Sequence, residues 1–294
     1  MRRAARLMAI CGCMGILGGC GGAEKAAEKV EKAVDPVAQA AEKTTASGGA
    51  RMIGGMKMRV EGLTVPLTIN GEVSFDDQAL QMRMNMGQIK GASPADMAAG
   101  RREGGFPIEL VQLPDHVFVS TGQVREKGKK DGVEWIRLDL EELDDEAGLD
   151  LQRANQYSEV NPDAMLRFLR TTGDARKTGT ATVRGERTER YEGTIDLQRY
   201  PDLVPEKDKA AARRTVDVMV KSWGGTKHPI SVFINDDGVI VREKMPIDFE
   251  DGGDRVKGMM VIDLVDVGSP QEIELPDRDE VVDVTDEAAK HFGG

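Results

Sequence analysis

The sequence predicts an α+β fold built on one curved antiparallel sheet of about ten strands with about three helices. From Arg51 onward, most segments alternate apolar and polar residues with a period of two, which is typical of strands with one buried and one solvated face. These segments follow one another through tight turns, which favours antiparallel pairing over parallel crossovers. A sheet of this many strands must twist and curl. The helices that interrupt the strand order could then cover its concave face.

The predicted strands begin soon after a first helix and continue almost to the end of the chain. Asp236-Asp237-Gly238 is a strong hairpin signal between two of them. Residues 87–105 have the composition of a loop or flap, 122–132 that of a charged hairpin tip, and 141–159 that of an irregular acidic segment. The expected strands are 51–60, 67–75, 81–86, 107–112, 115–120, 133–140, 177–184, 188–198, 229–235, 239–245 and 255–266.

Three segments have helical patterns. Asp35 followed by Pro36 has the form of an N-cap and a first helical residue, and it predicts a helix over 36–45. Asn161-Pro162 opens a second helix that ends near Gly173. The third covers 208–221, and its end at Trp223-Gly224-Gly225 predicts a glycine C-cap, with Trp223 either plugging a cavity or packing plainly. A short amphipathic piece follows at 285–292.

The N-terminus predicts export and lipid attachment. Three arginines precede an apolar run from Leu7 to Leu17, and Leu17-Gly18-Gly19 is followed directly by Cys20. A basic start, a short apolar run and small residues at a cleavage point make a secretory signal. The cysteine in this setting resembles a bacterial lipobox, in which the thiol receives a diacylglycerol and becomes the first mature residue. An uncleaved anchor or an ordinary signal peptide is the alternative, although a spanning helix needs about 20 apolar residues.

Cysteine usage and charge limit the chemistry of the remaining chain. The three cysteines lie at positions 11, 13 and 20, so removal of residues 1–19 leaves only Cys20, which would be acylated. That leaves no disulfide and no thiol nucleophile. Without the three arginines of the signal, 37 basic residues face 51 acidic ones, a net charge of −14. This balance argues against nucleic-acid binding and against attachment to anionic lipid by charge.

The best functional clue in the body is a set of methionines with matched parity on neighbouring strands. Methionine is flexible and polarizable, so it fits changing apolar shapes; ordinary core packing is the alternative interpretation. The same parity rule adds aliphatic residues from other strands. The predicted cavity lining is Met56, Met58, Leu67, Ile69, Val73, Met82, Met84, Met86, Ile195, Leu197, Ile230, Val232, Ile234, Met260 and Ile262.

No motif of catalysis or metal binding emerges. His116, His228 and His291 are far apart and lack metal-ligand spacing, so we interpret all three as structural or surface residues. The acidic groups 144–146 and 248–254 lack the spacing of a calcium loop. Since no nucleophile has a base beside it, we predict a protein that is not an enzyme and needs no metal or other cofactor.

Three segments in the second half resemble the actinobacterial LolA/LppX-like envelope lipoproteins, of the LppX/LprG type. They are Val183–Leu197, His228–Ile240 (with Phe233 where tryptophan is frequent and Asn235 where aspartate is frequent), and the tail segments Asp263–Gly268, Ile273–Pro276 and Glu280–Asp283. The resemblance covers residues 35–285. It implies a half-barrel sheet closed by helices over a hydrophobic cavity that takes lipid or lipoprotein acyl chains.

Together these observations divide the chain into a signal (1–19), a lipidated tether (20–34), a lipid-binding half-barrel domain (35–285) and a tail (286–294). The first hypothesis is an exported lipoprotein, anchored to the outer face of the cell membrane through Cys20, that binds or carries acyl-chain ligands. The alternative is a sensor or regulatory interaction module on the same fold, acting on a membrane transporter or regulator. A cavity well above about 300 Å³ favours the first.

Overall fold

The computed structural model describes residues 35–60, 63–87, 107–120, 135–147, 162–251 and 254–292. In this part of the chain, twelve strands form one curved, open sheet with the order β12-β6-β5-β4-β3-β2-β1-β11-β10-β9-β8-β7. The strands are β1 (Gly49–Val60), β2 (Leu63–Ser74), β3 (Ala79–Met86), β4 (Pro107–Gln112), β5 (His116–Ser120), β6 (Trp135–Asp139), β7 (Arg176–Val183), β8 (Glu186–Asp196), β9 (Lys227–Asn235), β10 (Ile240–Asp251), β11 (Asp254–Val265) and β12 (Val281–Asp283).

Strand pairing joins the two halves of the sequence at the middle of the sheet. β1 pairs with β2 on one side and with β11 on the other, both antiparallel. The other neighbouring pairs on both sides are also antiparallel, and β9–β10 is a hairpin at the predicted Asp236-Asp237-Gly238 turn, where Gly238 has a φ of 75°. The exception is β12, which runs parallel to β6. Each half therefore extends from β1–β11 towards its own sheet edge.

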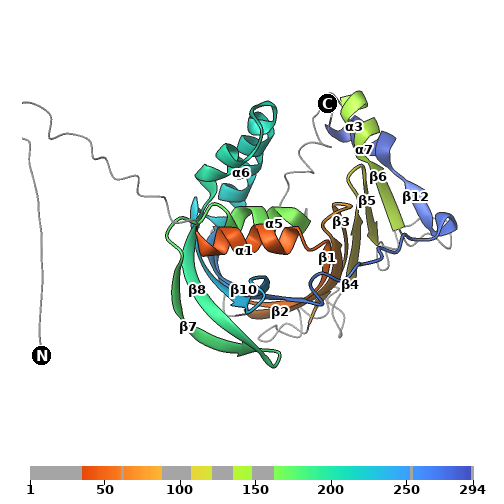
Figure 1. Cartoon of the computed structure of the whole chain (residues 1–294). Helices are drawn as coiled ribbons and strands as arrows, with labels where there is room; N and C mark the ends of the chain where they lie inside the picture. The colour runs from red at the N-terminus through yellow and green to blue at the C-terminus, as the bar shows by residue number, and fades with distance from the viewer. Residues whose placement is uncertain are drawn as a thin grey trace, which may run out of the picture. The chain divides into compact units, whose positions relative to one another are not determined.

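The described residues also form five α-helices and three short 3-10 helices. They are α1 (Pro36–Thr45), α3 (Leu140–Ala147), α5 (Pro162–Leu169), α6 (Lys209–Trp223), α7 (Thr285–Phe292), η1 (Leu197–Leu203), η2 (Glu206–Asp208) and η3 (Arg278–Glu280). Figure 1 shows α1 and α5 lying together within the curve of the sheet, whereas α3 and α7 lie together beside β6.

The helix α1 begins where the sequence predicts. The Asp35 side chain accepts hydrogen bonds from the backbone N–H groups of Val37 (2.9 Å) and Ala38 (3.2 Å), and Pro36 occupies the first turn. These bonds satisfy amide groups that have no partner within the helix. Val37, Ala40 and Ala41 then point into the core. A local cap and an apolar stripe thus fix both the start of the helix and its buried face.

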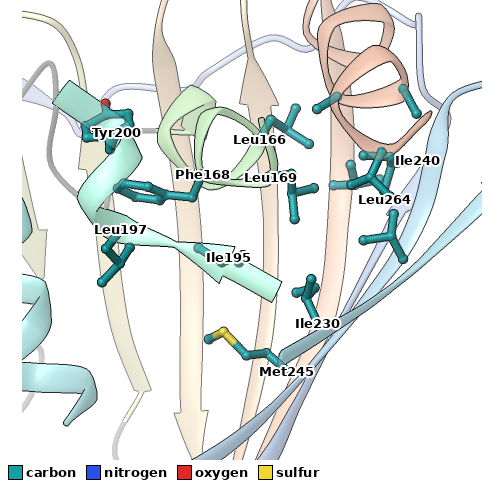
Figure 2. Close-up of a cluster of buried hydrophobic side chains, with 14 of the residues drawn as sticks. Leu166, Phe168, Leu169, Ile195, Leu197, Tyr200, Ile230, Ile240, Met245 and Leu264 are labelled. Carbon is teal, nitrogen blue, oxygen red and sulfur yellow. The ribbon is translucent and has the colours of Figure 1, made fainter. Parts of the chain in front are cut away.

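The core lies between this helical layer and the concave face of the sheet. Phe168 of α5 is fully buried, with its ring centroid 4.5 Å from that of Tyr200 in η1. Figure 2 shows these rings beside Leu197, while Leu169 and Ile240 converge from the other side of α5. The helices therefore cover the β8–β9 part of the concave face.

An ion-pair cluster stabilises the opposite, convex face. The Asp263 side chain on β11 is only 5% exposed and accepts hydrogen bonds from Arg242 and, at 2.8 Å, from Arg184. Burial alone would raise the pKa of this carboxyl, but the two guanidinium groups hold it below its ordinary value. The cluster ties the β7–β8 turn to β10 and β11.

Several expectations differ from the structure. The sheet has twelve strands instead of about ten, because the three-residue β12 has too short a pattern to predict. Residues 141–147 are not irregular: Asp139 accepts hydrogen bonds from the Glu141 and Glu142 amides and caps α3, so there are more helices than three. The strand expected over 188–198 ends at Asp196, whose side chain accepts a hydrogen bond from the Gln198 amide and starts η1. The segments 88–105 and 122–132 lie outside the described residues.

Candidate functional site

A cavity of about 420 Å³ opens between the concave face and the helices. Its walls come from β1, β2, β3, β10 and β11, together with α5 and the end of α6. Burial increases along β10 towards its start: Phe249 and Ile247 are half-buried, whereas Met245 and Glu243 are buried. The cavity therefore has an open end near Phe249 and a deep end near Glu243.

Seven of the predicted residues line this cavity: Met56, Met58, Ile69, Val73, Met82, Met260 and Ile262. Cross-strand register explains why they meet. Met56 lies opposite Met260, and Gly54 lies opposite both Ile69 and Ile262, so alternate residues of β1, β2 and β11 share one face. The parity of the sequence therefore places these residues on one wall.

The other predicted residues do not line this cavity. Leu67 and Met84 pair with Met56 and Ile69 and so share their face, but they lie beyond its boundary. The Met86 side chain lies outside the described residues. The remaining five lie in the packed core, because α1, α5, α6 and η1 cover the β8–β9 part of the sheet. These five are Ile195, Leu197, Ile230, Val232 and Ile234.

Further lining residues were not foreseen from the sequence. On β10, alternate residues Met245, Ile247 and Phe249 lie on the inner face. The strand predicted from the sequence ended at residue 245, so the last two were not included. Trp223 also lines the cavity, which is one of the two roles that the sequence allows for it, and His228, which we interpret from the sequence as structural or surface, lines it as well. Other residues lining the cavity wall and its rim are Met52, Phe75, Leu80, Met165, Leu166, Pro246, Asp248 and Leu264.

The open end is bordered by aromatic groups in fixed positions. Trp223 and His228 meet edge to face with ring centroids 5.1 Å apart, and His228 Nε2 lies 2.8 Å from the carbonyl oxygen of Gly225. Gly224 ends α6 with a φ of 77°, and a Cβ there would lie 2.7 Å from the Cβ of Phe249. Glycine thus allows both the left-handed C-cap and the close approach of Phe249.

Charges at the rim are paired. The exposed Asp248 carboxylate accepts hydrogen bonds from Arg255 at 2.7 and 3.0 Å, and Arg255 holds the pKa of Asp248 below its ordinary value. Lys257 lies 3.6 Å from the same carboxylate. The rim therefore has a balanced polar border.

The deep end contains one carboxyl group of a different character. Glu243 is 4% exposed, and its cross-strand partners are the apolar Val232 and Ile262. Its Oε2 atom is buried without a hydrogen-bond partner among the described residues. Burial raises the pKa of this carboxyl from 4.5 to about 7, because desolvation disfavours the charged form.

Other classes of site are not seen in the part of the chain that the structure describes. No group of three or more histidine, aspartate, glutamate or cysteine residues is arranged to hold a metal ion there. None of the helices described has both the length and the apolar character to cross a membrane. Cys20 lies outside the described residues, as does the His291 side chain.

Comparisons with known proteins agree with the sequence resemblance. No protein-family model matches the chain. A protein of Streptomyces coelicolor, named provisionally as a lipoprotein, is 26% identical over 156 residues, and this match spans about half of each chain, 52% of both. LprF from Mycobacterium bovis has a TM-score of 0.43 and 15% identity, covering 82% of this chain and 95% of its own. The lipoprotein LppX from Mycobacterium tuberculosis has a TM-score of 0.38 and 15% identity, covering 82% and 100%.

The relatives to which the chain is similar thus include two proteins that are named as lipoproteins. More distant is MucB of Pseudomonas aeruginosa, seen in complex with MucA, with a TM-score of 0.30 and 10% identity over 80% of this chain. Each of these TM-scores lies below 0.5, so any function has to be inferred from the residues of the cavity.

Proposed function

We propose that this protein is a lipid-anchored lipoprotein of the cell envelope that holds acyl chains in the cavity above β1, β10 and β11. The observation that carries the proposal is the cavity itself. At about 420 Å³ it falls within the range of small-molecule sites, and its walls are almost entirely apolar. This volume favours ligand holding over the alternative of a regulatory module with a packed interior.

The methionine-rich wall suits acyl chains of different lengths. Met56, Met82 and Met260 come from three strands and face the same space. Their unbranched side chains can change rotamer around a flexible ligand without leaving a void. Each buried methylene of the ligand would contribute about 0.8 kcal/mol to binding. The lipobox sequence ending at Cys20 supports attachment to the outer face of the cell membrane.

Two neighbouring methionines on β11 provide a matched test of ligand uptake. Met260 lines the cavity, whereas Met259 is 45% exposed on the other face of the strand. The full chain with Cys20→Ala would be titrated with a fluorescent acyl probe. We expect Met260→Trp to fill the cavity and abolish most uptake, and Met259→Trp to bind like the parent. Equal binding by both variants, or no uptake by the parent, would contradict the proposal.

The anchor has its own test, independent of the cavity. Cells expressing the full chain would be labelled with an alkyne fatty acid, and membrane and soluble fractions compared. Cys20→Ala should lose the label and leave the membrane fraction, whereas Cys13→Ala should keep both. Label that persists in Cys20→Ala would refute acylation at this residue.

A further inference from the structure

The deep end of the cavity contains a polar group that an all-hydrocarbon ligand would leave without a partner. Glu243 lines the cavity, is 4% exposed, and its Oε2 has no hydrogen-bond partner among the described residues. Burying such an oxygen unpaired costs about 1–3 kcal/mol. A buried, unsatisfied carboxyl in a ligand-sized cavity therefore points to a hydrogen bond with the ligand.

We propose that Glu243 is the specificity-determining residue of this cavity, and that the ligand is a long-chain molecule whose uncharged hydroxyl or carbonyl group hydrogen-bonds to it at the deep end. This inference rests on the proposed function and adds the chemical class of the ligand. Glu243 lies six residues along β10 from Phe249, about 20 Å at about 3.4 Å per residue. The polar group of the ligand is thus carried inwards with its chain and does not stay at the rim.

Charge disfavours an anionic ligand group at the deep end. An anionic group beside the neutral Glu243 carboxyl would bury a charge in an apolar space that offers it no cationic partner among the described lining residues. Other ionisable residues lining the cavity are His228, whose ring is held near the Gly225 carbonyl, and Asp248, which is paired with Arg255. No lysine or arginine lines it among the residues that the structure describes. The neutral carboxyl, favoured because burial raises its pKa to about 7, can both donate to a carbonyl and accept from a hydroxyl.

The test is displacement of a bound apolar fluorescent probe from the full chain with Cys20→Ala. The competitors would be dodecane, dodecan-1-ol, dodecanoate and dodecylamine, each below its aggregation limit. Glu243→Leu should weaken dodecanol about fivefold to tenfold and leave dodecane unchanged or tighter. Glu243→Gln, whose amide also donates and accepts, should keep the preference for the alcohol. Thermal unfolding of each variant would establish that the fold is retained.

The pH dependence of ligand affinity distinguishes the effect of Glu243 from that of the other ionisable groups lining the cavity. Between pH 5 and pH 8 the affinity of the parent for dodecanol should change as Glu243 titrates, whereas that of Glu243→Gln should change less, because His228 and Asp248 are common to both chains. Unchanged dodecanol affinity in Glu243→Leu would overturn the inference. So would a preference for dodecylamine that strengthens as the pH rises, since Glu243 would then act as an anion. Failure of every competitor, dodecane included, would instead overturn the proposed function.

Discussion

Replacing Glu243 should make the stability of the protein less dependent on pH. In the folded state burial raises the pKa of this carboxyl to about 7, whereas in the unfolded chain it returns to about 4.5. Between these values the folded state binds the proton and the unfolded state does not. The free energy of unfolding therefore falls as the pH rises through this window. Since one pKa unit is worth about 1.4 kcal/mol, the full change is about 3 kcal/mol.

The assay is urea unfolding followed by tryptophan fluorescence at pH 5, 6, 7 and 8. Relative to Glu243→Gln, the parent should lose about 2.5 kcal/mol of stability between pH 5 and pH 8, with most of the loss below pH 7. Glu243→Leu should be the most stable chain at pH 8, because it removes the buried charge and retains apolar contacts. Parallel pH profiles for the parent and the Gln variant would refute the reasoning, as would a parent that gains stability with rising pH.

Three further substitutions and one matched control test the surrounding fold. Asp263→Asn should lower the free energy of unfolding by about 1–3 kcal/mol, because it weakens charge-assisted bonds on the convex face; denaturation that is unaffected at pH 7 would contradict this. Gly224→Ala should cost at least about 1 kcal/mol, since it adds a Cβ at positive φ against Phe249, and a wild-type midpoint would show that α6 ends differently. Phe168→Ala should cost about 3–5 kcal/mol, whereas Val218→Ala, at a residue 58% exposed on α6, should change the free energy of unfolding by no more than about 0.5 kcal/mol; similar losses from both would contradict the assigned core.

Local patterns predicted most of the elements because their causes lie within a few residues. Period-two alternation identified strands such as β2 and β3. Asp35 and Pro36 placed the start of α1, and Asp236-Asp237-Gly238 placed a hairpin. These features depend on caps, turns and side-chain alternation, each of which acts along the chain itself. The sequence-based cysteine argument is of the same kind, since it needs only the positions of the three thiols.

Elements with distant causes escaped prediction. β12 exists because Val281–Asp283 pairs with Trp135–Arg137, far away in the sequence. The acidic segment at 141–147 is helical because Asp139 caps it and Leu143 is buried. The segment has few apolar residues, and its many acidic residues are as common in loops as in helices. The Asp139 cap is local, but the pairing of β12 and the burial of Leu143 depend on parts of the chain that lie elsewhere in the sequence.

The sequence by itself determined which residues face inward, because parity along a strand decides the face of the sheet. Only the tertiary structure decided which inward residues border empty space and which are covered. Ile195 and Ile230 pack beneath α5 and its neighbours, whereas Met56 and Met260 face the cavity. Glu243 has the same parity as Met245, yet nothing local indicates that its carboxyl lacks a partner. That property depends on strands and helices brought together from the whole chain, and folding alone creates it.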